Sequence, residues 1–115
     1  MATKGHKDLI VWQKSMDLVV MVYELTKQYP KDELYQLTSQ MRRAAVSIPS
    51  NIAEGRKRGG ETEFRQFLRI AFGSAAELET QIEISQRLGY ASEPSLLRIN
   101  ATLDEIMRML SHMTS

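Results

Sequence analysis

The chain has 115 residues, which is the size of one domain with a single hydrophobic core, and its formal net charge is only +1. It contains no cysteine, so disulfides, thiolate metal sites and a cysteine nucleophile are excluded. No apolar run approaches the roughly 20 residues of a membrane span, and the N-terminus lacks the apolar segment of a signal peptide. We therefore expect a soluble, cytoplasmic protein that does not enter a membrane.

The first predicted helix covers about residues 9–29, and the residues before it, up to about Lys7, are expected to form a loosely attached arm. One apolar face recurs at spacings of three and four through Leu9, Trp12, Met16, Val19, Tyr23 and Thr26. A second stripe lies beside it at Val11, Leu18, Val22 and Leu25. A helix that is apolar around so much of its circumference must be buried on more than one side, which favours association between subunits.

The second predicted helix covers about residues 34–57 and turns Leu37, Met41, Ala44, Ala45, Ile48 and Ile52 inward. Pro49 lies inside it, and a proline there removes one backbone hydrogen bond at a cost of roughly 3 kcal/mol. We expect the helix to bend at Pro49; the alternative is a restart, with Ser47 as the cap of a new helix. The helix should end near Gly55 or shortly after, where basic residues precede Gly59 and Gly60.

A polar motif surrounds this proline and consists of Ser47, Pro49, Asn51, Glu54 and Gly55. Helical spacing aligns Arg43, Ser47 and Asn51, with Glu54 and Gly55 one turn further on. We favour a satisfied hydrogen-bond network of Arg43, Ser47, Asn51 and Glu54 that fixes the helix for packing or for subunit contacts. Direct contact with a ligand is the alternative.

The third and fourth predicted helices cover about residues 62–88 and 94–113. Thr62 and Ser92 are the expected N-caps, and Pro94 suits the first turn of the last helix. Their inward positions are Phe64, Leu68, Ala71, Ala75, Leu78, Ile82 and Ser85, then Leu96, Ile99, Leu103, Ile106, Leu110 and Met113. The small residues Ala71, Gly73, Ser74, Ala75 and Ala76 indicate a closely crossing helix. Four helices with short connections predict an all-α, antiparallel up-down four-helix bundle.

A catalytic or metal site has little support in the sequence. The two histidines, His6 and His112, lie near opposite ends of the chain, and neither belongs to the Glu-x-x-His motif of di-metal bundles. Glu79 and Glu83 are one helical turn apart, which is more typical of solvated or paired acids. Gly59 and Gly60 lack the Lys-Ser/Thr that follows in a phosphate loop. We predict no catalytic residue, no metal ligand and no cofactor.

Basic residues gather in the middle of the chain. Residues 42–69 hold seven basic and three acidic side chains, whereas residues 70–115 hold three and six. We predict that RNA or DNA phosphates contact Arg42, Arg43, Arg56, Lys57 and Arg58, with Arg65 and Arg69 as further candidates. No known nucleic-acid motif or interleaved aromatic platform accompanies them. The competing hypotheses are an oligomeric protein-binding scaffold, in which these charges only solvate the surface, and a metalloenzyme bundle.

Four segments in order resemble bacterial four-helix-bundle proteins encoded in intervening sequences of 23S rRNA genes: Asp8–Lys14, Leu34–Ala44, Ser47–Gly55 and Gly73–Gln81. The resemblance covers nearly the whole chain. It implies a bundle that assembles as a ring, a homopentamer. Related accessory proteins of diversity-generating retroelements use a basic ring to bind nucleic acid and a reverse transcriptase. The family's Ser-Asn-Ile-Ala-Glu-Gly segment falls on Ser50–Gly55, and its paired arginines fall on Arg42 and Arg43.

Overall fold

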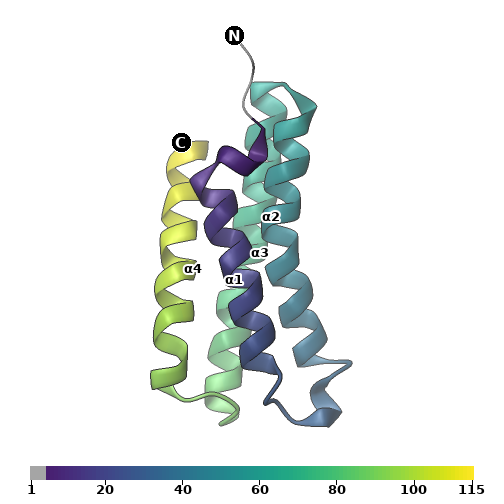
Figure 1. Cartoon of the computed structure of the whole chain (residues 1–115), viewed down its shortest axis with the longest axis vertical. Helices are drawn as coiled ribbons and strands as arrows, with labels where there is room; N and C mark the ends of the chain where they lie inside the picture. The colour runs from purple at the N-terminus through teal and green to yellow at the C-terminus, as the bar shows by residue number, and fades with distance from the viewer. Residues whose placement is uncertain (1–4) are drawn as a thin grey trace.

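A computed structural model describes residues 5–115 of the chain. These residues form four long helices: α1 (Ile10–Thr26), α2 (Leu37–Arg58), α3 (Glu61–Arg87) and α4 (Glu93–Thr114). Two 3-10 turns, η1 (His6–Asp8) and η2 (Lys31–Glu33), precede α1 and α2. Successive long helices run in opposite directions, and each contacts its two neighbours in the cycle α1, α2, α3, α4 (Figure 1). The predicted four-helix bundle is therefore confirmed.

The bundle measures 50 Å along its longest dimension. Its two ends differ in their connections. We call the end that holds residues 27–36 and 88–92 the loop end, and the end that holds Gly59 and Gly60 the turn end. Gly59 has a φ of 83°, a left-handed conformation that glycine adopts at little cost, so the chain reverses within two residues. None of the helices between residues 5 and 115 combines the length and the hydropathy that a membrane span needs.

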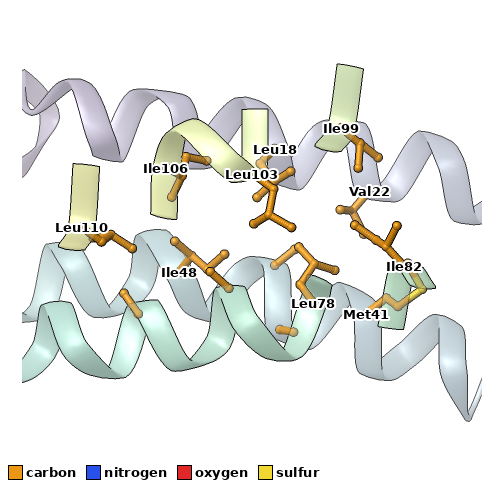
Figure 2. Packing of buried hydrophobic residues seen from close by; sticks show 14 of the residues in the cluster. Leu18, Val22, Met41, Ile48, Leu78, Ile82, Ile99, Leu103, Ile106 and Leu110 are labelled. Carbon is orange, nitrogen blue, oxygen red and sulfur yellow. The ribbon is translucent and has the colours of Figure 1, made fainter. Parts of the chain in front are cut away.

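The core fills the centre of the bundle with aliphatic side chains from all four helices (Figure 2). Every inward position predicted for α2 is buried. The same holds for α3 and α4, except that Phe64 and Met113 are only partly buried at the turn end. Spacings of three and four residues therefore identified the core of these three helices correctly.

The core face of α1 differs from the first predicted face. Val11, Leu18 and Val22, from the second stripe, are buried, whereas Met16 and Tyr23 from the first are exposed. Ser15 completes the buried stripe because its hydroxyl donates to the Val11 carbonyl at 2.6 Å, which satisfies it inside the core. The sequence showed both stripes, and the polar Ser15 made the second one look less continuous than the first. Of the first stripe, Met16 and Tyr23 remain on the surface of the single chain, whereas Leu9, Trp12 and Val19 are partly buried against the core and Thr26 is buried.

Pro49 lies inside one continuous helix, so the alternative of a restart capped by Ser47 is wrong. Ile48, Pro49 and Ile52 are all buried. Burying an isoleucine side chain fully contributes about 1.5–3 kcal/mol, so these two isoleucines offset the roughly 3 kcal/mol that the proline costs. Helix α2 therefore continues through Pro49 to Arg58, one residue beyond the predicted bound of about residue 57.

The helix ends depart from the predictions by one to three residues. Helix α1 ends at Thr26 rather than near residue 29, because the residue before Pro30 disfavours helix. Gln36, at φ −126° and ψ −106°, delays the start of α2 to Leu37. Thr62 is not the cap of α3, since the turn at Gly59 lets the helix begin at Glu61 with Gly60 as N-cap. Ser92 is the N-cap residue of α4, although its side chain makes no cap hydrogen bond.

The predicted N-terminal arm is partly wrong. Residues 1–4 lie outside the described residues, but His6–Asp8 form a 3-10 turn that contacts α1 and α2. The His6 ring meets the Trp12 ring edge-on with centroids 5.0 Å apart, and the Gln13 side-chain amide donates to the Lys7 carbonyl at 2.9 Å. These contacts hold the start of the described chain against the turn end of the bundle.

At the loop end, the two connections are tied together by side chains. The Tyr90 hydroxyl donates to a carboxylate oxygen of Glu33 at 2.7 Å, and the other oxygen of Glu33 accepts the Leu37 backbone N–H at 3.4 Å. The Tyr29 and Tyr90 rings lie beside each other with centroids 5.5 Å apart. The hydrogen bond to Glu33 raises the pKa of Tyr90 above its ordinary value of 10.0, because it favours the protonated hydroxyl.

Candidate nucleic-acid interface

The predicted basic residues fall in two separate places on α2. Arg42 and Arg43 lie in its first two turns, and Arg56, Lys57 and Arg58 form its last turn. Arg43 and Arg56 are therefore about 20 Å apart along the helix, at 1.5 Å per residue. The structure brings the last three residues together and leaves the two arginines near the loop end.

The turn end carries the larger group of cations. Arg65 and Arg69 follow on the first turns of α3 and are exposed, as are Lys57 and Arg58. We call Arg56, Lys57, Arg58, Arg65 and Arg69 the basic end. The basic side chains thus come from two antiparallel helices that meet at the Gly59–Gly60 turn. Their closeness in the chain is visible in the sequence, but the direction in which each side chain points is not.

Phenylalanines of α3 support two of these arginines. The guanidinium carbon of Arg56 lies 5.6 Å from the Phe64 ring centroid, and that of Arg58 lies 5.2 Å from the Phe67 centroid. Cation–π contacts at exposed sites contribute about 0.5–1 kcal/mol each, enough to bias a side chain without fixing it. Phe64, which also packs on the core, and Phe67 therefore both contact arginines at the surface.

Acidic side chains offset part of this charge. Glu54 pairs with Arg58 at 3.0 Å, and Glu61 lies 3.9 Å from Arg65. Glu63 is a third carboxylate in the first turn of α3. Such solvent-exposed pairs contribute at most about 1 kcal/mol, so an incoming phosphate competes with them readily. The basic end keeps two more cations than anions.

The arginine pair near the loop end has a different setting. The Arg42 Nε donates to the Thr26 hydroxyl at 2.9 Å, and its guanidinium carbon lies 4.6 Å from the Tyr23 ring centroid. Arg43 is exposed. Both line a groove of about 480 Å³ whose other residues are Tyr23, Leu34, Tyr35, Ser39 and Val46. We call it the tyrosine groove.

The two tyrosines of this groove were not predicted from the sequence as part of a binding surface. Tyr23 comes from α1 and Tyr35 from the connection before α2, so neither is interleaved with Arg42 and Arg43 in the chain. The sequence places Tyr23 outside the core stripe of α1, but it does not tell which neighbouring helix the ring lies beside.

Comparisons with known proteins give the chain a family. The family described as 23S rRNA-intervening sequence protein matches residues 7–112. The chain belongs to this family. A structure of a protein of unknown function, assigned to the S23 ribosomal protein family from Bacteroides thetaiotaomicron VPI-5482, is similar, with a TM-score of 0.84 and 26% sequence identity. The similarity covers 92% of this chain and 99% of that one. No curated protein matches the chain.

In this member of the 23S rRNA-intervening sequence protein family, the polar motif forms a smaller network than predicted. The Asn51 side-chain amide donates to the Ser47 carbonyl at 2.8 Å and to its hydroxyl at 2.9 Å. The Ser47 and Ser74 hydroxyls are hydrogen bonded at 2.8 Å, which joins α2 to α3. Arg43 and Glu54 belong to the surface instead, because Arg43 points to the solvent-exposed groove and Glu54 pairs with Arg58.

Gly55 of the same motif has a packing role. A Cβ added at this position would lie 2.5 Å from the Phe67 Cβ, closer than carbon atoms approach. Gly55 is buried, and α2 and α3 make the most extensive contact in the bundle. A glycine is therefore required where the two helices converge toward the turn end. The close crossing predicted from Ala71 and Ser74 is confirmed, whereas Gly73 is exposed with open space around it.

Proposed function

We propose that this chain is a non-catalytic protein that binds RNA or DNA through the basic end of its bundle. The observation that carries the proposal is the placement of basic residues on both sides of the Gly59–Gly60 turn: Arg56, Lys57 and Arg58 in the last turn of α2, and Arg65 and Arg69 in the first three turns of α3. Exposed cations of this kind contact phosphates without any sequence-specific motif. The setting we propose is the bacterial cytoplasm, and binding of this kind requires no cofactor.

The contacts at the basic end are suited to exchange with phosphate. The pairs of Arg58 with Glu54 and of Arg65 with Glu61 are exposed and weak. The Phe64 and Phe67 rings bias where Arg56 and Arg58 lie without fixing them, so their guanidinium groups can turn toward a phosphate oxygen.

Fluorescence anisotropy with labelled structured RNA and duplex DNA across a salt series tests the proposal. We expect binding that weakens steeply with salt, and a variant with Arg56, Lys57 and Arg58 changed to alanine that loses about 10-fold or more in affinity. The matched control changes Arg87, Arg98 and Arg108 to alanine, which removes the same charge from α3 and α4. Equal losses in both variants, or no binding by the unaltered protein at low salt, would overturn the proposal.

We further propose that the chain assembles with itself as a ring of five copies, the assembly that the resemblance implies. Met16 and Val20, one turn apart on α1, support self-association because both are exposed, Val20 at 61%. Neighbouring apolar residues on one surface are typical of protein contacts. A ring would present five basic ends together, and linked sites bind a long nucleic acid more tightly than single ones.

Light scattering tests the assembly. We expect a mass of five times the 13.2 kDa chain, and a lower mass for Val20→Glu, which puts a charge into the contact. Leu97→Glu on α4 makes the same change at another exposed apolar residue and tells whether the effect is specific to α1. A single-chain mass for the unaltered protein would reject the ring.

A second candidate function, a homo-oligomeric scaffold that binds a protein and no nucleic acid, is favoured by the same exposed residues of α1. Apolar contacts do not weaken when salt is added, whereas phosphate contacts do. Assembly without nucleic-acid binding at any salt concentration would favour this candidate over the first.

A further inference from the structure

The tyrosine groove near the loop end combines an exposed ring with two arginines. Tyr35 lies just before α2 with 89% of its surface exposed, the largest exposure among the bulky apolar and aromatic residues described. Leu34 and Val46 add apolar surface, and Arg42 and Arg43 stand beside them. An exposed ring contributes almost no burial free energy to folding, so the position of Tyr35 beside two arginines is not explained by stability.

Arg42 is held in place before any ligand arrives. Its Nε–H donates to Thr26, whose hydroxyl in turn donates to the Val22 carbonyl at 2.8 Å. The guanidinium group also lies over the Tyr23 ring. The hydrogen bond to Thr26 uses one of five N–H donors, so the group keeps donors for a ligand while its orientation is restricted.

A second small groove continues the first and adds two lysines. Its lining residues are Thr26, Lys27, Tyr29, Pro30, Lys31, Leu34, Thr38 and Arg42, so Leu34 and Arg42 are common to both. No carboxylate lines either groove among the described residues. Acids lie close by, since Glu24 pairs with the groove residue Lys27 at 3.3 Å, the exposed Asp32 follows Lys31, and Glu33 bonds Tyr90. The four cations that line the two grooves, Arg42, Arg43, Lys27 and Lys31, outnumber these acids, so the surface has a small net positive charge that suits an anion.

We propose that the tyrosine groove binds an unpaired nucleotide, with the base stacked on Tyr35 and its phosphate held by Arg42 and Arg43. The inference rests on the proposed function and narrows its ligand to single-stranded nucleic acid. Stacking on an aromatic side chain requires a base whose face is open, which a duplex does not offer. The two arginines supply charge-assisted hydrogen bonds to phosphate oxygens.

The distance to the basic end fits one continuous strand. Arg43 and Arg56 are about 20 Å apart along α2, and a strand that keeps the duplex rise of about 3.4 Å per nucleotide covers this distance with roughly six nucleotides, whereas a more extended single strand needs fewer. The surface of α2 between them exposes Val46, Ser50 and Glu54, of which only Glu54 is charged, and Glu54 is paired with Arg58 at 3.0 Å. A strand lying along α2 would therefore contact the groove through a base and the basic end through its backbone.

The test uses a labelled single strand of about twelve nucleotides, as RNA and as DNA, and an abasic phosphodiester strand of the same length. Tyr35→Ala should weaken binding of the base-containing strand about 5- to 100-fold, whereas Tyr35→Phe, which keeps the ring, should bind as the unaltered protein does. The abasic strand should bind both variants equally. The RNA and DNA strands tell which sugar the groove prefers, and light scattering checks that the variants assemble alike.

Three results would overturn this inference. If Tyr35→Ala binds every strand normally while the triple alanine variant of Arg56, Lys57 and Arg58 does not, the groove has no role and the proposed function stands. If Tyr35→Ala lowers the assembled mass, Tyr35 is a contact between copies of the chain. If the unaltered protein binds no strand, the inference and the proposed function both fail.

Discussion

The two ends of α2 carry arginines in opposite kinds of surroundings. At the loop end, side-chain hydrogen bonds join residues far apart in the chain, Thr26 to Arg42 and Glu33 to Tyr90. At the turn end, the ion pairs join residues four apart on one helix, Glu54 with Arg58 and Glu61 with Arg65. Long-range bonds fix a geometry, and solvated local pairs leave side chains to reorient. The first arrangement suits recognition of a shape, and the second suits a phosphate backbone of any sequence.

Gly55→Ala should have the largest effect on stability, and it acts at the turn end. Gly55 lies where α2 and α3, the two helices of the basic end, approach each other closely. The added methyl group would meet the Phe67 Cβ, which cannot move without its helix. We expect the free energy of unfolding to fall by about 1–3 kcal/mol, the usual cost of overpacking a tight site. Chemical denaturation measures it.

Gly73→Ala is the matched control for this change. Gly73 also lies inside a helix, but nothing lies within 4 Å of an added Cβ. Alanine should therefore raise the free energy of unfolding by about 0.5–1 kcal/mol, because it costs less backbone entropy than glycine. Two changes of the same sign would contradict the close approach at Gly55.

Thr26→Val should have the next largest effect, confined to the loop end. The substitution keeps the side-chain shape and removes the oxygen that accepts the Arg42 Nε–H. We expect a loss of about 1 kcal/mol in unfolding free energy, since the half-exposed arginine finds water in its place. Binding of a single strand should weaken several-fold while binding of duplex DNA stays unchanged.

The control for this change is Thr38→Val. The Thr38 hydroxyl is buried and has no hydrogen-bond partner among the described residues. Replacing it should leave stability unchanged or raise it slightly, because an unsatisfied polar atom is removed. Equal destabilisation by both substitutions would mean that the bond to Arg42 contributes nothing specific.

Glu54→Gln should have a small effect on stability and an opposite effect on binding. Breaking the exposed pair with Arg58 should cost about 0.2–0.5 kcal/mol. Removing a competing carboxylate should raise the affinity for duplex DNA about two- to three-fold at low salt. Glu83→Gln breaks a similar pair, with Arg87, at the C-terminal end of α3 and far from the basic end. It should leave the affinity for duplex DNA unchanged. A gain in both variants would show that only net charge matters.

The smallest effect we expect is a pH dependence at the loop end. The pKa of Tyr90 is raised by its hydrogen bond to Glu33, so in the unfolded chain this hydroxyl loses its proton first. Its contribution to stability is complete below pH 10 and disappears as the pH rises through the folded-state pKa. The free energy of unfolding, measured by chemical denaturation from about pH 9 to about pH 11, should fall less steeply with pH for Tyr90→Phe than for the unaltered protein. Parallel curves would contradict the bond.

Most of the fold followed from the sequence because three helices have one clear apolar face. Helix α1 did not, since it is apolar on two sides and a hydrogen-bonded Ser15 interrupts the true core stripe. The candidate site was predictable only in part. Arg56, Lys57 and Arg58 are adjacent in the chain and had to lie together, whereas the pairing of Arg42 with Tyr23 and of Gly55 with Phe67 depends on contacts between helices. Periodicity within one helix contains no information about such contacts.

The described chain starts and finishes at the same end of the bundle as the Gly59–Gly60 turn (Figure 1). A tag or fusion partner attached after Ser115 would therefore emerge at the turn end, and a polyhistidine tag would add its own positive charge there when protonated. Labels for binding studies are better attached at the opposite end, for example through a cysteine introduced in the 88–92 connection. The absence of natural cysteines makes such a label specific to a single position.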